Sequence, residues 1–373
     1  MPGKQTHTRV AGQQNPFPDM KKMRKTDVLI VGQGLAGCML ALELRKRKVD
    51  FLVVAPSGGR QASLVAAGLY FPLSPRKPAI DTVFRTCYPV MGNAYRETET
   101  LLGISLLHEI PSIKLFPPAD LEQWRTFQQG PDGSVIQTVA DHAIIPGIKP
   151  GWSMAVIRPS GYVDLPVLIH ACRNWFIREN RYIDHHLDYS GVDHSDKRAR
   201  IYISGGCHVE ARHLVFCEGA AGADNPWFGE MELTPNKGEL VDIAVDGLPE
   251  KSIMRCSLNL LPLGNGKFRA GATYSRNPVN DIPSRKGLDE LTYKLREFVS
   301  RPFRIITHHA GLRPASRNRK PIVGSHPEYP ALSVFNGLGS KGVLQAPYYA
   351  WILADQLASG RVSPLKSLSQ QEA

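Results

Sequence analysis

Apolar residues concentrate in short runs separated by glycine and proline along most of this 373-residue chain. Near its beginning, four branched apolar residues, 28–31, run directly into three glycines, and an apolar segment with strong helical preference follows from Cys38 to Leu44. A short apolar run that ends in turn residues indicates a buried strand. The pattern therefore predicts a strand over 27–31, a sharp turn and a helix.

The rest of the chain alternates between helical and strand-like patterns. Helices are expected at 81–107, 161–176 and 288–300, and strands at 49–60, at 211–220 and between 236 and 274. Short strands broken by proline and glycine are expected from 108 to 150. The stretch 308–357 predicts two strands joined by a basic hairpin, a second glycine loop and a terminal helix, in which Pro347 is tolerable if it falls in the first turn.

The first glycine cluster has the spacing G-x-G-x-x-G. Gly32 permits the turn, Gly34 allows the backbone to approach a pyrophosphate, and Gly37 allows the helix to lie close to the strand. The free N–H groups of the helix N-terminus then face the anion. An ordinary glycine-rich turn is the alternative, but the strand-turn-helix context favours dinucleotide binding.

The acidic residue that usually follows such a loop is missing. A carboxylate at the end of the second strand commonly holds the ribose hydroxyls. In this chain Asp50 lies at the wrong end of that strand, and Ala55 and Pro56 occupy the useful end. Because Arg60 follows, NADP with its 2′-phosphate is an alternative for this segment alone.

A second G-x-G-x-x-G stands near the other end of the chain, at residues 337–342, after the apolar run ALSVF. Two anion-binding helix N-termini suit a long cofactor with negative charge at both ends, as in reduced FAD. Lys341 would stabilise the anionic edge of the flavin. A surface turn before a C-terminal helix is the alternative.

Charge and composition narrow the class of protein. The net charge is +11, and residues 1–26 hold six basic residues and one acidic residue. This tail has no apolar signal segment and predicts a basic flexible extension that contacts nucleic acid or solvent. No run of eighteen apolar residues occurs, and the six cysteines form no zinc-ligand spacing. We therefore expect a cytoplasmic enzyme without a membrane span and, despite a histidine-rich stretch at 185–194, without a metal site.

Several motifs in order resemble a known family. They are VGQGLAG, SLVAAG (63–68), SGYVD (160–164), VFCEGA (215–220), AGATY, AGLRP…PIVG (310–324) and GLGSKG. The chain resembles the FAD-dependent amino-acid oxidase family of glycine, sarcosine and D-amino-acid oxidases. Within that family, PNKGE (235–239) and the GLGSKGV…AP ending are most similar to the oxidase half of a bifunctional enzyme that matures a tRNA wobble uridine.

The resemblance implies roles for individual residues. The pyrophosphate loop would comprise Gly32, Gly34, Leu35, Ala36 and Gly37; the flavin would be lined by Ser63, Ala66, Ala67 and Gly68; and its pyrimidine edge would face Gly337, Gly339, Ser340, Lys341 and Gly342. Arg313 would grip the carboxylate of the substrate. Arg313 and Lys341 are the expected catalytic residues.

The implied architecture is α/β, with a Rossmann-like FAD domain interleaved with a smaller β-rich substrate domain. The expected segments are a tail at 1–25, an FAD domain at 26–79, 151–235 and 301–365, and a substrate domain at 80–150 and 236–300.

The implied reaction is oxidation of the C–N bond of a small-molecule amine, glycine-like or N-substituted glycine, by hydride transfer to FAD. The alternatives are a stand-alone oxidase acting on a nucleoside-linked glycine in tRNA, which is the less favoured partner, and a flavin-binding protein without turnover.

Overall fold

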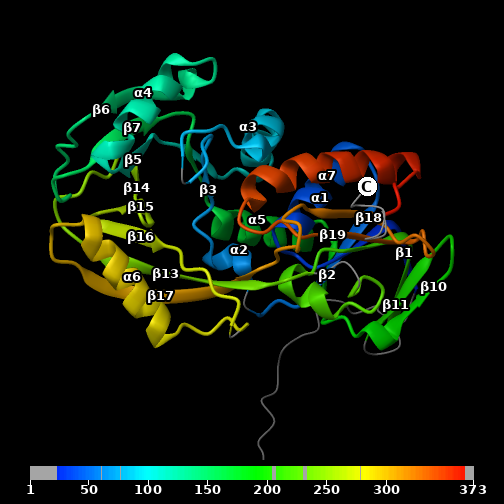
Figure 1. Ribbon diagram of the computed structural model, residues 1–373. Coiled ribbons are helices and arrows are strands. Elements are labelled where there is room, and N and C mark those ends of the chain that lie inside the picture. The colour runs from blue at the N-terminus through cyan, green and yellow to red at the C-terminus, as the bar shows by residue number, and fades with distance from the viewer. Residues whose placement is uncertain are drawn as a thin grey trace, which may run out of the picture.

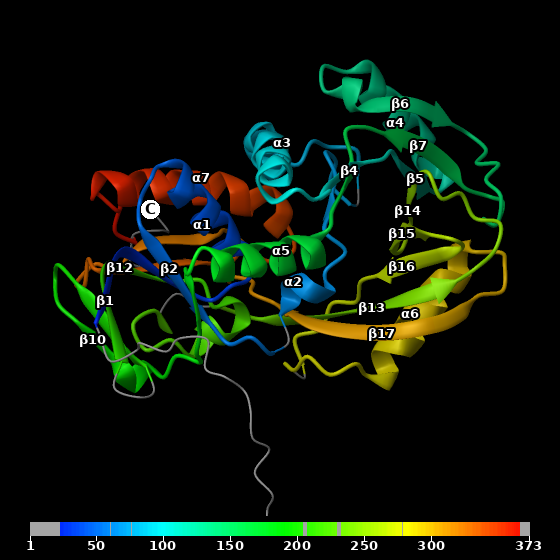
Figure 2. The same ribbon diagram turned by 180° about the vertical axis from the view of Figure 1, so that it is seen from behind.

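The computed structural model describes residues 23–59, 61–75, 77–203, 207–229, 233–277 and 279–365. Two large sheets lie side by side in Figures 1 and 2, each eight-stranded, and a short helix, α2 (Ala62–Val65), lies between them. A third, three-stranded sheet joins β3 (Leu69–Tyr70), β8 (Gly161–Val163) and β4 (Leu107–Glu109). The mixed α/β class with two sheet-based units agrees with the sequence.

The first sheet has a parallel core. Its parallel strands are β9 (Tyr182–Asp184), β2 (Phe51–Ala55), β1 (Arg24–Val31), β12 (Cys207–Phe216) and β19 (Leu332–Asn336), and antiparallel strands β10 (Val192–His194), β11 (Ala199–Ile203) and β18 (Ile322–Ser325) extend it. Every residue of β2 is buried. A parallel strand covered on both faces requires such a continuous apolar run.

Four helices cover one face of this sheet and share a single hydrophobic core. They are α1 (Leu35–Lys46), α3 (Thr82–Leu102), α5 (Leu165–Arg178) and α7 (Gly342–Ser359). The first helix packs against the last, and α3 also packs on α7, so segments from both ends of the chain complete one unit.

The second sheet is mostly antiparallel. Its strands, in order across the sheet, are β17 (Arg304–Arg313), β13 (Asn236–Ala244), β16 (Lys267–Gly271), β15 (Asn259–Gly264), β14 (Ile253–Arg255), β5 (Ser112–Phe116), β7 (Ser153–Ile157) and β6 (Ile136–Ala140). Helix α6 (Arg285–Phe298) packs on one face through Leu291, Leu295 and Phe298, and α4 (Leu121–Gln129) contacts β6. The opposite face approaches α2, because a Cβ on Gly311 would lie 3.5 Å from Val65 Cβ.

Four segments differ from the sequence-based boundaries. β7 and β17 lie in ranges assigned to the FAD domain, but both pair within the second sheet. α3 was assigned to the substrate domain, but it packs on α7. Arg24 and Lys25 belong to β1 rather than to the tail, because β1 pairs with β12 from Arg24 onward; the tail before residue 23 lies outside the described residues. A local pattern predicts a strand or helix without identifying its distant partner.

The helix expected at 161–176 begins later than predicted. Residues 161–163 form β8, and α5 begins at Leu165. The carboxylate of Asp164 accepts a hydrogen bond from the N–H of Val167 at 3.2 Å, and Pro166 occupies the first turn. A side-chain cap followed by proline is a typical helix start.

Pro347 lies deeper in the last helix than expected. Because α7 begins at Gly342, Pro347 is beyond the first turn, and the carbonyl of Val343 loses its usual intrahelical donor. The hydroxyl of Tyr95, from α3, donates a hydrogen bond to this carbonyl at 3.1 Å. Tyr95 is fully buried, and burial raises the pKa of its hydroxyl, so it remains a donor. The tertiary contact replaces the helical bond that proline removes.

We therefore predict that Tyr95→Phe destabilises the protein by about 1–3 kcal/mol, because it leaves a buried carbonyl without a donor. Urea denaturation followed by circular dichroism measures this loss. Tyr293→Phe on α6, where the tyrosine is 68% exposed, is the matched control and should leave the free energy of unfolding unchanged. Equal stabilities of the two variants would contradict the role of the hydroxyl.

Candidate functional site

The first glycine loop has the backbone geometry that its spacing predicts. Gly32 has a φ of 102°, and a Cβ there would overlap the carbonyl oxygen of Cys217 at the end of β12. A Cβ on Gly37 would overlap the carbonyl oxygen of Gly32, so α1 lies directly against the turn. These two positions therefore exclude any side chain, and the loop brings the start of α1 to the carboxyl edge of the sheet.

The start of α1 has free hydrogen-bonding capacity. Its N-cap is Gly34, which supplies no side-chain cap, and the first turn includes Leu35, Ala36 and Gly37. The N–H of Leu35 lies 3.3 Å from Ser63 Oγ, which places Ser63 at this helix end. By contrast, the N-cap side chains of α3, α5 and α6, Asp81, Asp164 and Ser284, each accept a hydrogen bond from their own helix. An uncapped N-terminus beside a hydroxyl suits a phosphate group.

The segment expected to line the flavin continues from Ser63. Ala66 and Ala67 are half-buried, and Gly68, with a φ of 64°, accepts a hydrogen bond from the N–H of Val163 at 3.0 Å. A Cβ on Gly68 would overlap the Val163 carbonyl. This contact fixes the end of the segment against β8 of the three-stranded sheet.

The second glycine loop lies beside the first. A Cβ on Gly342 would come within 3.3 Å of Leu35 Cδ2, so the starts of α1 and α7 pack together. The N-cap of α7 is Lys341, which supplies no side-chain cap either. Gly337 is in the left-handed region with a φ of 75°, Gly339 donates its N–H to the carbonyl of Pro314 at 2.9 Å, and Ser340 is exposed. The structure thus unites two uncapped helix ends from opposite ends of the chain.

Lys341 makes a contact that the sequence did not predict. Its Nζ lies 2.6 Å from Oδ2 of Asp81, the N-cap residue of α3. The lysine side chain remains 42% exposed, while that of Asp81 is 12% exposed. The ammonium group is therefore held at the start of α7 by a fixed carboxylate.

Arg313 is a half-buried cation without an acidic partner among the described residues. Its guanidinium donates to Asn236 Oδ1 at 3.1 Å and to the carbonyl of Thr273 at 3.2 Å. Burial lowers the pKa of Arg313 from its ordinary value. A Cβ on Gly238 would overlap the guanidinium, so this glycine provides the space it fills. The next residue, Pro314, contacts the second glycine loop, which places Arg313 at the junction of both units.

The missing ribose carboxylate has a candidate on the neighbouring strand. Ala55 ends β2 as expected, but it is only 2% exposed, and its register partner on β9 is Asp184. Asp184 Oδ1 accepts a hydrogen bond from the N–H of Ser57 at 2.7 Å, just beyond the strand end. Asp184 therefore brings a carboxylate to the edge where Ala55 cannot, whereas Arg60 lies outside the described residues. Asp184 could have been identified from the sequence only with the knowledge that β9 pairs with β2.

The histidine-rich stretch has a structural role where its contacts are known. Nε2 of His194 accepts a hydrogen bond from Trp227 Nε1 at 3.1 Å, and the His194 ring lies 4.5 Å from that of Tyr329. Within the described ranges, no group of three metal-ligating side chains is present. Among all the residues that the structure describes, no helix is long and apolar enough to cross a bilayer.

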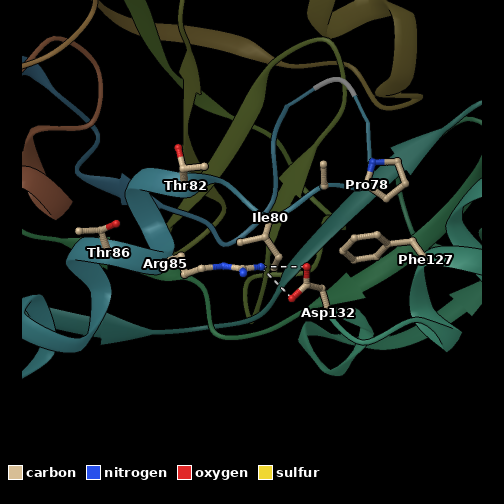
Figure 3. A pocket seen from close by; sticks show the side chains of 8 residues that line it. Pro78, Ile80, Thr82, Arg85, Thr86, Phe127 and Asp132 are labelled. Atoms are coloured by element: carbon tan, nitrogen blue, oxygen red, sulfur yellow. Dashed lines mark hydrogen bonds and ion pairs between the residues drawn. The ribbon is translucent and has the colours of Figure 1, made fainter.

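A surface cavity lies at the start of α3, beside Asp81. It has a volume of about 510 Å³ and is lined mainly by Pro78, Ile80, Thr82, Arg85, Phe127 and Asp132. Figure 3 shows Arg85 reaching Asp132, and their ion pair of 2.8 Å links α3 to the loop after α4. Because no residue of either glycine loop lines this cavity, we place the functional site at the loops and Arg313.

Comparisons with known proteins identify the family of this chain. The family model DAO, FAD dependent oxidoreductase, matches residues 27–356. Glycine oxidase of Bacillus licheniformis is 25% identical over 91% of this chain and 95% of its own. The crystal structure of iminodiacetate oxidase from Chelativorans sp. BNC1 has a TM-score of 0.72 at 19% identity, covering 92% of this chain and 98% of its own.

A further relative is a tRNA-modifying protein. The bifunctional protein for tRNA 5-methylaminomethyl-2-thiouridine biosynthesis of Shewanella amazonensis is 23% identical over 92% of this chain and 58% of its own. Both branches of the resemblance seen in the sequence are thus confirmed.

We predict that Gly37→Ala reduces FAD affinity by at least about tenfold, since the added methyl group pushes α1 away from the turn that holds the pyrophosphate. Quenching of flavin fluorescence measures the Kd. Gly92→Ala in α3 is the control, because a Cβ there has open space. A Gly37→Ala variant that binds FAD as tightly as the wild type would contradict this account of the loop.

Proposed function

The chain belongs to the DAO family of FAD-dependent oxidoreductases, and we propose that it oxidises the C–N bond of glycine or an N-substituted glycine held by Arg313. FAD is the cofactor of this family. The relatives named glycine oxidase and the neighbour named iminodiacetate oxidase support amino-acid or amine substrates.

The observation that carries the proposal is the charge state of Arg313. A guanidinium removed from water needs a compensating anion, and a carboxylate matches its two parallel N–H donors. Asn236 and the Thr273 carbonyl accept two of its hydrogen bonds, but neither is charged. A substrate carboxylate would supply the missing charge and would be oriented by a bidentate pair.

The cofactor would be held by residues whose geometry fits it. The two uncapped helix N-termini and Ser63 would bind its anionic groups, and residues 66–68 would line the flavin. FAD, when bound, supplies the acceptor for a hydride from the carbon next to the substrate nitrogen. The substrate also loses its N–H proton, and water converts the resulting imine to a carbonyl compound and an amine.

The roles of the protein residues are mainly positional. Arg313 fixes the carboxylate and thereby the adjacent carbon, which lowers the entropic part of the barrier. Lys341, held by Asp81, adds positive charge at the start of α7, where it would stabilise negative charge that develops during reduction.

We predict that Arg313→Ala lowers kcat/KM for glycine or sarcosine, because the carboxylate loses its buried partner. The loss of transition-state stabilisation should be about 2–5 kcal/mol. Anaerobic reduction of the flavin, followed by its absorbance, measures the rate. The corresponding amines without a carboxylate, methylamine and dimethylamine, should change much less.

Arg304→Ala provides a matched control, because Arg304 is an exposed arginine on the same strand. Equal losses for both substrate types in Arg313→Ala would mean that Arg313 supports the flavin or the fold instead. A bound flavin that no amine reduces would favour a binding protein without turnover.

The tRNA-modifying relative motivates the alternative substrate, a nucleoside-linked glycine. Our proposal predicts that removal of residues 1–22 leaves kcat/KM for free amino acids unchanged, because these residues precede β1. Stopped-flow reduction of the shortened protein tests this. Flavin reduction by tRNA alone, with binding that weakens steeply with salt, would favour the alternative.

A further inference from the structure

A second arginine is buried deeply near the proposed site. Arg255, the last residue of β14, is only 4% exposed, and its Nη1 is buried with no hydrogen-bond partner in the described part of the chain. Its guanidinium lies 3.7 Å from the ring centre of Phe71. Phe71 follows residues 66–68, the segment expected to line the flavin. The ring covers one face of the cation and supplies no formal negative charge.

The register of the second sheet shows which face carries Arg255. The preceding residue, Met254, belongs to the core on the α6 side. Because neighbouring side chains of a strand point to opposite faces, Arg255 lies on the other face, toward Phe71 and the FAD-binding unit. Its register partner on β5 is Lys114, whose strand neighbour Leu115 also belongs to the α6-side core. The two cations therefore share the face that looks toward the cofactor site.

Neither Arg255 nor Lys114 forms an ion pair within the residues that the structure describes, although Asp120 lies near enough to Lys114 to raise its pKa. Burial lowers the pKa of Arg255 to about 9, and burial followed by the proximity of Arg255 lowers that of Lys114. A guanidinium keeps its charge in proteins, so Arg255 remains a cation. An unpaired buried cation is costly, and an anion bound beside it would offset that cost.

The register also relates Arg255 to Arg313. Arg313 donates to the carbonyl of Thr273, two residues beyond Gly271. Gly271 pairs with Asn259, and Asn259 pairs with Arg255. Two strand spacings, about 10 Å, therefore separate the backbone of Arg255 from the strand that ends beside the Arg313 guanidinium.

We propose that Arg255, assisted by Lys114, binds a second anionic group of the substrate, so that the enzyme acts on glycines whose nitrogen carries an acidic arm. This inference rests on the proposed function, because Arg313 is taken to hold the first carboxylate. Arg255 is a specificity-determining residue: it binds the arm and takes no proton or electron. Both carboxylate and phosphonate arms present the anionic oxygens that the site would recognise.

The kinetic test compares substrates that differ only in the arm. Holoenzyme is reduced anaerobically with iminodiacetate, N-(phosphonomethyl)glycine or sarcosine, whose methyl group has no charge. We expect Arg255→Met to lower kcat/KM for iminodiacetate about 100-fold and to change that for sarcosine less than about threefold. Arg255→Lys should recover part of the loss. The ratio of the two acidic substrates distinguishes a carboxylate arm from a phosphonate arm.

A binding measurement separates this inference from the proposed reaction. Oxydiacetate has both carboxylates but no amine, and methoxyacetate has only one. Calorimetry on the holoenzyme should show that Arg255→Met weakens the binding of oxydiacetate at least about tenfold and leaves the affinity for methoxyacetate unchanged. Arg313→Ala should weaken both ligands. Lys267→Met, which removes an exposed cation from the same sheet, controls for net charge.

The outcomes are distinguishable. If no amine reduces the flavin but oxydiacetate binding depends on Arg255, the anion site stands and the proposed reaction fails. If sarcosine and iminodiacetate react equally well in wild type and Arg255→Met, and oxydiacetate binds both equally, the anion site is overturned and the reaction stands. Flavin absorbance and the melting temperature establish that each variant is folded; if Arg255→Met fails to fold, Arg255→Lys and Lys114→Met carry the same comparison.

Discussion

The contact between the starts of α1 and α7 is the constraint on which the rest of the molecule depends. Each helix end carries a partial positive charge of about half an elementary charge, and neither end has a side-chain cap. Leu35 packs against Gly342, so the two like-charged ends are held together by apolar burial. The parallel strands and the shared helical core serve to position this meeting point. A cofactor with separated negative charges relieves the repulsion.

The second sheet contains two kinds of charged residue. Lys237 pairs with Glu239 at 3.0 Å, and Arg269 pairs with Asp242 at 2.8 Å, so these cations are neutralised inside the protein. Arg313 and Arg255, by contrast, have no acidic partner in the described residues, and both lie toward the cofactor side of the sheet. The unpaired charges thus lie on the face of the sheet where we propose that the substrate binds.

The sequence predicted best what depends on local backbone chemistry. The spacing of Gly32 and Gly37 reports steric contacts within one strand-turn-helix unit, and that unit formed as expected. Motif order also identified the family. Features that depend on the pairing of distant strands were not predicted. Asp184 became a candidate because β9 lies beside β2, and Arg255 because β14 lies beside β5. Nothing in the residues around these two side chains indicates which strand will be the neighbour.

The proline of the last helix also constrains how this family of sequences can change. Pro347 removes one donor from α7, and the hydroxyl of Tyr95 replaces it from a helix more than two hundred residues earlier. Loss of the hydroxyl alone leaves a carbonyl unpaired, whereas loss of the proline restores the amide donor and makes the hydroxyl dispensable. Positions 95 and 347 should therefore vary together among relatives, as a correlated pair visible in an alignment.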